Sequence, residues 1–148
     1  MKEYSIKHDT FSLERTYSAS PAQVYAAWSD PASKANWFPK ADEFDFCVGG
    51  REIIRAGEPD GPIYASIFTF QEIVPNNRIV YTATLDMGEK RISVYVVTVE
   101  LKADGAGGTK LVYTEQCAFL DGLDSKEVHI EGANAVLDKL EIELRLAK

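Results

Sequence analysis

The end of the chain, from Ser125 to Lys148, has the apolar spacing of an amphipathic helix. Asp124 and Ser125 are residue types that commonly precede a helix, because their side-chain oxygens accept hydrogen bonds from the first free backbone N–H groups. Roughly 22 residues at about 1.5 Å each give a rod of about 33 Å, the width of a small domain. With a period of 3.6 residues, one side of this helix carries His129, Ala133, Val136, Leu137, Leu140 and Leu144. We therefore expect a long terminal helix that buries one side against the rest of the protein.

The chain before this helix mainly alternates apolar and polar residues, as strands with one buried face do. A first strand is expected over residues 11–17, followed by two short helices. Ser20-Pro21 predicts the start of one helix, and Asp30-Pro31 predicts its end and the start of the next, since the residue before proline avoids the α region. Further strands are expected over residues 44–48, 51–55, 63–74, 78–85, 91–102 and 109–119.

These elements indicate the α+β class. Consecutive strands joined by short turns pair antiparallel, and a twisted sheet with a single long helix tends to curl over that helix. We expect a curved antiparallel sheet of about six to seven strands around the terminal helix. With 148 residues and no repeat or linker, the chain is expected to form a single domain over residues 1–148.

The charge pattern limits the range of partners. The net charge is −7, from 23 acidic and 16 basic residues, and the basic residues are scattered. Binding to nucleic acid or to an anionic membrane surface needs clustered cations, so we expect neither. No apolar run approaches the ~20 residues that span a bilayer, and the N-terminus lacks the apolar core of a secretion signal. We therefore expect a cytoplasmic protein that does not insert into membranes.

The sequence contains no local motif that is typical of a catalytic, metal or cofactor site. Cys47 and Cys117 lie far apart, so we expect two buried, unpaired thiols and no metal knuckle or redox motif. The sequence also lacks the motifs of serine hydrolases, zinc proteases, P-loop proteins and dinucleotide-binding proteins. It therefore predicts no cofactor, no metal and no assigned catalytic residue, and it leaves open whether the protein is an enzyme.

Three ionisable residues fall at positions that face the interior. Arg15 and Glu115 share the apolar parity of their strands, and a buried charge needs a partner, which an Arg15–Glu115 or Arg51–Glu115 pair would supply. Such a pair is either structural or a polar anchor for the head of an amphipathic ligand. His129 lies on the inward side of the terminal helix. It is either a general base or ligand-binding donor, or a partly buried histidine satisfied by backbone or water.

Several segments together resemble the SRPBCC superfamily. They are residues 19–31, 37–39, 45–51 and 70–80, with Gly132 and residues 137–140. Within it, the chain resembles the branch named after the C-terminal domain of the activator of the ninety-kilodalton heat-shock protein ATPase. Residues 91–93 and 114–122 resemble a bacterial single-domain subgroup of that branch. Each motif alone is weak evidence of the family. Their order and spacing, from about residue 11 to residue 146, are together specific for its fold.

The resemblance implies the helix-grip fold, in which a curved antiparallel sheet wraps around the C-terminal helix and often encloses an apolar cavity. Its members include lipid carriers, plant hormone receptors, polyketide cyclases and the co-chaperone domain, so it fixes architecture better than activity. The candidate cavity residues are Trp28, Trp37, Phe46, Tyr64, Phe68, Phe70, Tyr81, Tyr95, Tyr113, Glu115, His129, Ala133 and Leu137. A structural role is expected for the family-motif residues Asp45, Gly49, Gly50 and Arg51.

One departure from the family pattern concerns the size of this cavity. Ala133 stands where the family often has a large aromatic residue, commonly tryptophan. The loss of an indole from a helix that faces the sheet should leave room. Phe68, at a position that is glycine in many relatives, is the residue that could fill it. The sequence leaves an enlarged and a filled cavity as equal alternatives.

Three functions are compatible with these observations. The first is a binding or transport module for a small apolar or amphipathic molecule, as a monomer or homodimer. The second is an enzyme of cyclase-like or hydrolase-like type that uses Arg15, Glu115 and His129 in the same cavity. The third is a co-chaperone-like domain that binds a protein partner.

Overall fold

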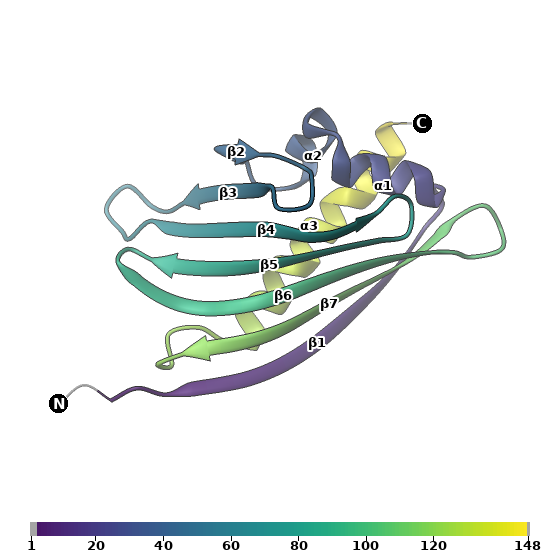
Figure 1. Cartoon of the computed structure of the whole chain (residues 1–148). Helices are drawn as coiled ribbons and strands as arrows, with labels where there is room; N and C mark the ends of the chain where they lie inside the picture. The colour runs from purple at the N-terminus through teal and green to yellow at the C-terminus, as the bar shows by residue number, and fades with distance from the viewer. Residues whose placement is uncertain (1–2, 148) are drawn as a thin grey trace.

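The computed structural model describes residues 3–147. Met1, Lys2 and Lys148, which the predicted domain and terminal helix include, lie outside this range. Within the described residues, a seven-stranded antiparallel sheet has the strand order β1-β7-β6-β5-β4-β3-β2, and three helices accompany it (Figure 1). This confirms the predicted α+β class and the helix-grip arrangement. No helix in the described part of the chain is long and apolar enough to cross a membrane.

The bounds of the elements follow the predicted order. The strands are β1 (Ile6–Tyr17), β2 (Glu43–Phe44), β3 (Arg51–Ala56), β4 (Tyr64–Val74), β5 (Arg78–Met87), β6 (Lys90–Ala103) and β7 (Thr109–Leu120). The helices are α1 (Pro21–Ser29), α2 (Pro31–Trp37) and α3 (Lys126–Leu146). β2 to β7 are consecutive neighbours, whereas β1 crosses the molecule to pair with β7, from Ile6 opposite Leu120 to Tyr17 opposite Thr109.

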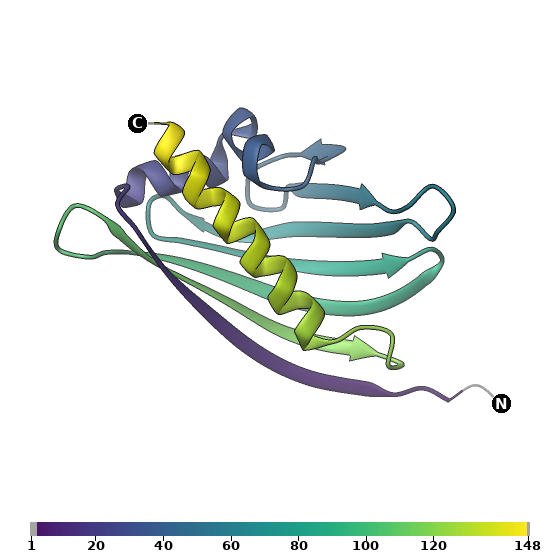
Figure 2. The same cartoon turned by 180° about the vertical axis from the view of Figure 1, so that it is seen from behind.

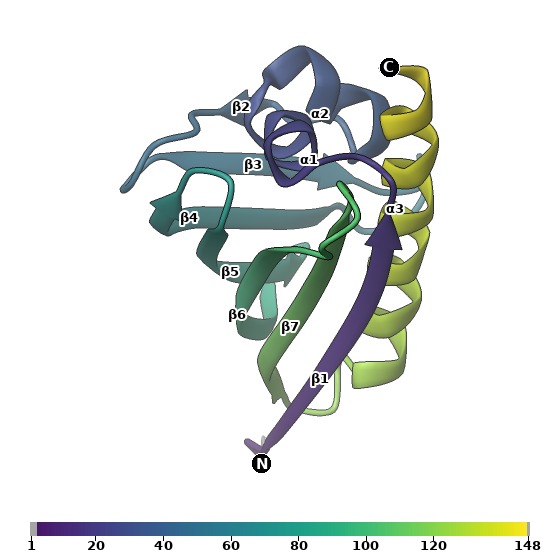
Figure 3. The same ribbon diagram turned by 90° about the vertical axis from the view of Figure 1, so that its right-hand side faces the viewer.

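The terminal helix lies diagonally across the concave face of the sheet (Figures 2 and 3). The Ser125 side chain accepts a hydrogen bond from the backbone N–H of Val128 and so caps the helix. The buried side of α3 consists of His129, Ala133, Leu137, Leu140 and Leu144, as the 3.6-residue period predicts. The sheet therefore encloses one side of the helix and leaves the other in solvent.

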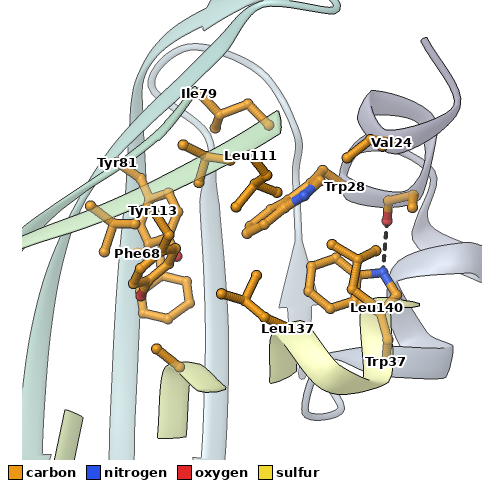
Figure 4. Close-up of a cluster of buried hydrophobic side chains, with 14 of the residues drawn as sticks. Val24, Trp28, Trp37, Phe68, Ile79, Tyr81, Leu111, Tyr113, Leu137 and Leu140 are labelled. Carbon is orange, nitrogen blue, oxygen red and sulfur yellow. Dashed lines mark hydrogen bonds between the residues drawn. The ribbon is translucent and has the colours of Figure 1, made fainter. Parts of the chain in front are cut away.

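The two short helices close one end of the space between α3 and the sheet. Ser20 and Gln23 form a capping box at the start of α1, and Asp30 ends α1 and caps α2. Trp28 and Trp37 pack edge to face with their ring centroids 4.8 Å apart, and the Trp37 indole donates a hydrogen bond to the Ala27 carbonyl. Figure 4 shows these tryptophans beside Leu111, Leu137 and Leu140. This end of the interior is a packed apolar core.

The strand predicted over residues 44–48 is wrong beyond Phe44. Residues 45–50 form a turn instead, in which Gly49 has φ +85° and a Cβ on Gly50 would lie 2.1 Å from the Asp45 carbonyl oxygen. The turn is held on β4, because the Gly49 N–H donates to the Phe70 carbonyl and the Phe70 N–H donates to the Gly50 carbonyl. Arg51 lies beyond the turn and pairs with Glu43 at 3.2 Å.

A buried ion pair joins α2 to β3. The Lys34 ammonium donates to Glu52 at 3.0 Å, and the side chains are only 5% and 1% exposed. The ammonium also lies 4.2 Å from the ring centroid of Phe38 and 5.0 Å from that of Phe44. Burial lowers the pKa of Lys34 and raises that of Glu52, and each partner opposes the shift of the other. The aromatic rings and the carboxylate together replace the water that the ammonium loses.

We predict that Lys34→Met destabilises the protein by about 3–5 kcal/mol, because the Glu52 carboxylate is then buried without a cation. Adding Glu52→Leu should recover most of the lost free energy of unfolding, since an apolar pair removes the uncompensated charge. Chemical denaturation measures both changes. Arg145→Met is the control, because its pair with Glu141 is exposed and should contribute little. A cost below about 1 kcal/mol for Lys34→Met would contradict the proposed role of the pair.

Candidate functional site

A pocket of about 230 Å³ lies between α3 and the concave face of the sheet. Every strand from β3 to β7 contributes to its lining, and the loop after α2 closes one side. The lining residues are Phe38, Pro39, Ile54, Ser66, Phe68, Tyr81, Tyr95, Tyr113, Glu115, His129, Gly132, Ala133 and Val136. Five of these 13 residues are phenylalanine or tyrosine, and the polar side chains lie at a few points of the wall.

A second hollow, of about 440 Å³, lies on the outside between α1, α2 and the end of α3. Its main ionisable groups are Asp30 and Glu143. Glu143 already accepts hydrogen bonds from Ser33 and Asn36, and Asp30 accepts one as the cap of α2. Because these polar groups are engaged in holding the helices together, the smaller pocket under α3 is the better candidate site.

β7 places the polar groups of the pocket by simple alternation. Leu111, Tyr113, Glu115, Cys117 and Phe119 are all buried on the concave side, while the residues between them are exposed or half-buried. This confirms the face predicted for Glu115. Tyr113 and Glu115 are two residues apart on one face, so the Tyr113 hydroxyl can donate to Glu115 Oε2, at 2.6 Å.

His129 lies between two carboxylates. Its Nδ1 is 2.6 Å from Glu115 Oε1, and its Nε2 is 2.5 Å from Asp124 Oδ2. Asp124 stands in the loop just before α3, and His129 is in the first turns of that helix. The Cys117 thiol completes the group by donating to Glu115 Oε1 at 3.5 Å. We call Glu115, Cys117, Asp124 and His129 the polar cluster.

The cluster holds the imidazole in its charged form. Burial alone would lower the pKa of His129, but hydrogen bonds with Asp124, Cys117 and Glu115, and the charge of Glu115, raise that pKa to about 11. Burial pushes the pKa of Asp124 upward, yet the hydrogen bond and charge of His129 and the hydrogen bond from the Ser125 N–H act against it, and that pKa is lowered. At neutral pH His129 is therefore an imidazolium with both nitrogens engaged.

The three tyrosines of the pocket stay neutral. Burial raises the pKa of Tyr81, Tyr95 and Tyr113, and the nearby charge of Glu115 raises each further. Tyr113 partly opposes this rise for the pKa of Tyr81, and Ser66 partly opposes it for the pKa of Tyr95. The hydroxyls are therefore fixed groups that can exchange hydrogen bonds with a bound molecule but do not carry charge.

The predicted partners of Glu115 are wrong. Arg15 instead donates to Asp138 at 2.6 Å and to the Asn134 side chain at 2.7 Å, and Arg51 pairs with Glu43. Arg15 lies on the edge strand β1 alongside α3, so its long side chain reaches the rim of the helix and not the pocket. Glu115 meets His129, which the sequence analysis treated separately.

The structure brings together only part of the predicted cavity set. Phe68, Tyr81, Tyr95, Tyr113, Glu115, His129 and Ala133 line the pocket. Trp28, Trp37, Phe70 and Leu137 lie in the packed core instead. Phe46 packs on Phe70 with the ring centroids 4.9 Å apart, and Tyr64 is 41% exposed near the start of β4. Aromatic type and strand parity identify inward residues, but they do not separate a pocket wall from a filled core.

Other residues of the site were missed. Ile54 and Ser66 have the inward parity of their strands, and Gly132 is one turn from His129, so spacing could have indicated all three. Asp124 was interpreted only as a helix-start residue. Cys117 is buried as predicted, whereas the prediction for Cys47 is wrong because that thiol is exposed in the turn before Gly49.

Ala133 and Phe68 line the same pocket. The Phe68 ring lies 4.8 Å from the Tyr81 ring and 6.1 Å from that of Phe38, between centroids. Its ring therefore belongs to the aromatic wall of the pocket that Ala133 also lines. The sequence left an enlarged cavity and a filled cavity as alternatives. The structure lies between them, because Phe68 lines the space and a pocket of about 230 Å³ remains.

Solved structures with the same fold include two bacterial proteins of high similarity. Mll3558 from Rhizobium loti is 41% identical, with a TM-score of 0.89 over 94% of this chain and 99% of that one. A putative uncharacterized protein from Rhizobium leguminosarum is 38% identical, with a TM-score of 0.89 over 97% of this chain and 99% of that one. DynU16, a putative protein in the dynemicin biosynthetic locus, shares the fold at 21% identity. Its TM-score is 0.68 over 95% of this chain and 48% of that one.

None of the curated proteins matches the chain significantly. The family model described as activator of Hsp90 ATPase homolog 1-like protein matches residues 18–145, which include every element from α1 to β7 and nearly all of α3. The chain therefore belongs to this SRPBCC-type family.

Proposed function

We propose that the protein binds a small amphipathic molecule in the pocket under α3. The observation that carries this proposal is the composition of the wall, in which Phe38, Phe68 and Val136 supply apolar surface and Tyr81, Tyr113 and Glu115 supply polar points. Ligand sites are commonly lined by apolar and aromatic side chains with a few placed polar groups. An apolar part of the ligand would lie against α3, and its polar end would face β5 and β7.

The size of the pocket limits the ligand. Typical pockets for drug-sized molecules measure about 300–1,000 Å³, and this one measures about 230 Å³. A molecule of one or two rings fits this volume better than a lipid with long acyl chains. A longer ligand would require α3 or the loop at Phe38 and Pro39 to move outward.

The hydrogen-bond directions favour a ligand that donates. Tyr113 donates its only hydroxyl hydrogen to Glu115, so toward the neighbouring Tyr81 its hydroxyl can only accept. The Tyr81 oxygen then keeps its own acceptor capacity, and the Glu115 side-chain oxygens can accept as well. A hydroxyl or amino group at the polar end of the ligand would satisfy these oxygens.

The enzyme alternative has less support. Glu115 and His129 do line one pocket, which an acid–base mechanism requires, but Arg15 lies outside it. His129 has both nitrogens engaged by carboxylates, so it is not free to accept a proton from a substrate. The co-chaperone alternative rests on the family's description alone. A binding or transport role therefore explains more of the geometry.

The binding proposal is tested by native mass spectrometry of gently purified protein and by thermal shift with small hydroxylated aromatic compounds. A ligand at 100 times its dissociation constant stabilises the folded state by about 2.7 kcal/mol, which a thermal shift detects. We expect a bound small molecule or a saturable shift. A chain that carries no ligand and responds to none of these compounds would remove the proposal.

We predict that Ala133→Trp abolishes this binding and leaves the fold intact. The new indole fills the pocket, so no more than the usual overpacking cost of about 1–3 kcal/mol is expected. Val128→Trp is the matched control, because it adds the same side chain to α3 at a position that is exposed. Ligand binding that survives Ala133→Trp would place the ligand elsewhere.

We predict that Tyr81→Phe lowers the affinity for a hydroxylated ligand by about tenfold. This corresponds to the loss of one hydrogen bond of about 1.4 kcal/mol. The affinity for the same compound without its hydroxyl should not change. Titration calorimetry with the two compounds measures the difference, and Tyr64→Phe on the exposed end of β4 is the control. Equal losses for both compounds would show that Tyr81 contributes packing and not a hydrogen bond.

A further inference from the structure

Three donor atoms of different kinds converge beside the pocket. The Cys117 sulfur, a Glu115 carboxylate oxygen and a His129 ring nitrogen all lie within 4.8 Å of one another, and all three residues are buried. The sulfur is 3.5 Å from Glu115 Oε1, which is 2.6 Å from His129 Nδ1. Glu115 and His129 also line the pocket, so the group can be reached from solvent through it.

We propose that Glu115, Cys117 and His129 bind one divalent transition-metal ion, of which Zn²⁺ is the best fit. A thiolate, an imidazole nitrogen and a carboxylate oxygen are the ligand types that Zn²⁺ takes in proteins. Mg²⁺ and Ca²⁺ prefer oxygen ligands alone, so the sulfur and nitrogen select against them. The proposal concerns a site that the ligand-binding role does not require.

Asp124 supplies the outer contact that such a site needs. A histidine that binds a metal through one nitrogen usually donates its other N–H to a carboxylate or a carbonyl, which fixes the ring and its tautomer. His129 Nε2 meets Asp124 at 2.5 Å, on the opposite side of the ring from Glu115. The ring is therefore oriented with Nδ1 toward Glu115 and Cys117.

The net charge of the polar cluster allows a divalent metal ion to replace two protons. Without metal it contains two carboxylates, a neutral thiol and an imidazolium, with a net charge of −1. A divalent ion that displaces the proton of Nδ1 and the proton of the thiol leaves a thiolate, a neutral imidazole and the same net charge. Binding therefore releases two protons and adds no uncompensated charge to the interior.

Metal binding requires the three donor atoms to move to even spacing around one ion. Tetrahedral ligands with bonds of about 2.0–2.3 Å lie about 3.3–3.7 Å apart. The sulfur and Glu115 Oε1 already have this spacing, at 3.5 Å. Glu115 and His129 must separate from 2.6 Å, and the sulfur and the His129 nitrogen, which lie within 4.8 Å of each other, must also reach this spacing. The fourth position would face the pocket, where water or a ligand atom can occupy it, as in open zinc sites.

Cobalt titration of the chelator-treated protein tests this site. Co²⁺ takes the place of Zn²⁺ and reports a bond to thiolate through a near-ultraviolet charge-transfer band, and tetrahedral geometry through its visible bands. We expect one Co²⁺ per chain with both signals, displacement of Co²⁺ by Zn²⁺, and a higher melting temperature with Zn²⁺. A folded wild-type chain that takes up neither metal would overturn the proposal.

Matched serine variants identify the thiol. Cys117→Ser should abolish the charge-transfer band and weaken Zn²⁺ binding at least tenfold, whereas Cys47→Ser, at the exposed cysteine, should change neither. Asp124→Asn should keep the band and weaken Zn²⁺ binding about 10–100-fold, as expected for a positioning residue. A band that is lost in Cys47→Ser and kept in Cys117→Ser would assign the metal to the surface thiol and overturn the proposal. The Tyr81→Phe variant separates the two proposals, because it should weaken binding of the hydroxylated ligand while leaving the pocket open and all three metal donors in place.

Discussion

The contact between one side of α3 and the concave face of the sheet determines what the interior contains. Along this side the helix presents Leu144, Leu140 and Leu137, then Ala133, and finally His129. Interiors pack at nearly crystalline density, so a step from leucine to alanine leaves volume unless neighbours close it. The same contact therefore produces a packed apolar core at one end, a pocket in the middle and a charged cluster at the other end.

Buried charge lies on both sides of the pocket, and in each case a helix meets a strand. Lys34 of α2 pairs with Glu52 of β3, and His129 of α3 pairs with Glu115 of β7. Such pairs add little net stability relative to apolar side chains, but they penalise any arrangement that separates the partners. They therefore fix how α2 and α3 sit on the sheet, and with this the shape of the pocket between them. Tyr81 lies in the electric field of both, since Glu115 and Glu52 each raise its pKa.

The parts of the structure with strong periodicity could be predicted, and the parts set by contacts between elements could not. The 3.6-residue period identified α3 and its buried side, and the alternation on β7 placed Glu115 inward. Phe44 and Phe46 also alternate, but the hydrogen bonds of the following turn to Phe70 end the strand after Phe44. Strand parity gives the face on which a side chain lies but not the neighbour it reaches, which is why the partner of Arg15 was missed. The strand pattern and the resemblance to a known family both indicated a curved sheet around the helix, and no periodicity in the sequence indicated that a pocket would remain there.

The pairing of β1 with β7 has a consequence for how the chain acquires its structure on the ribosome. Ile6 lies opposite Leu120, so β1, the first strand of the sheet in chain order, has no neighbour until β7, the last strand, has been synthesised. Contacts between distant parts of a chain are slow to form because the intervening loop must close first. Until then β1 is a free strand that could pair with another nascent chain. The charged residues along β1, among them Asp9, Glu14 and Arg15, make that mispairing less favourable while synthesis is completed.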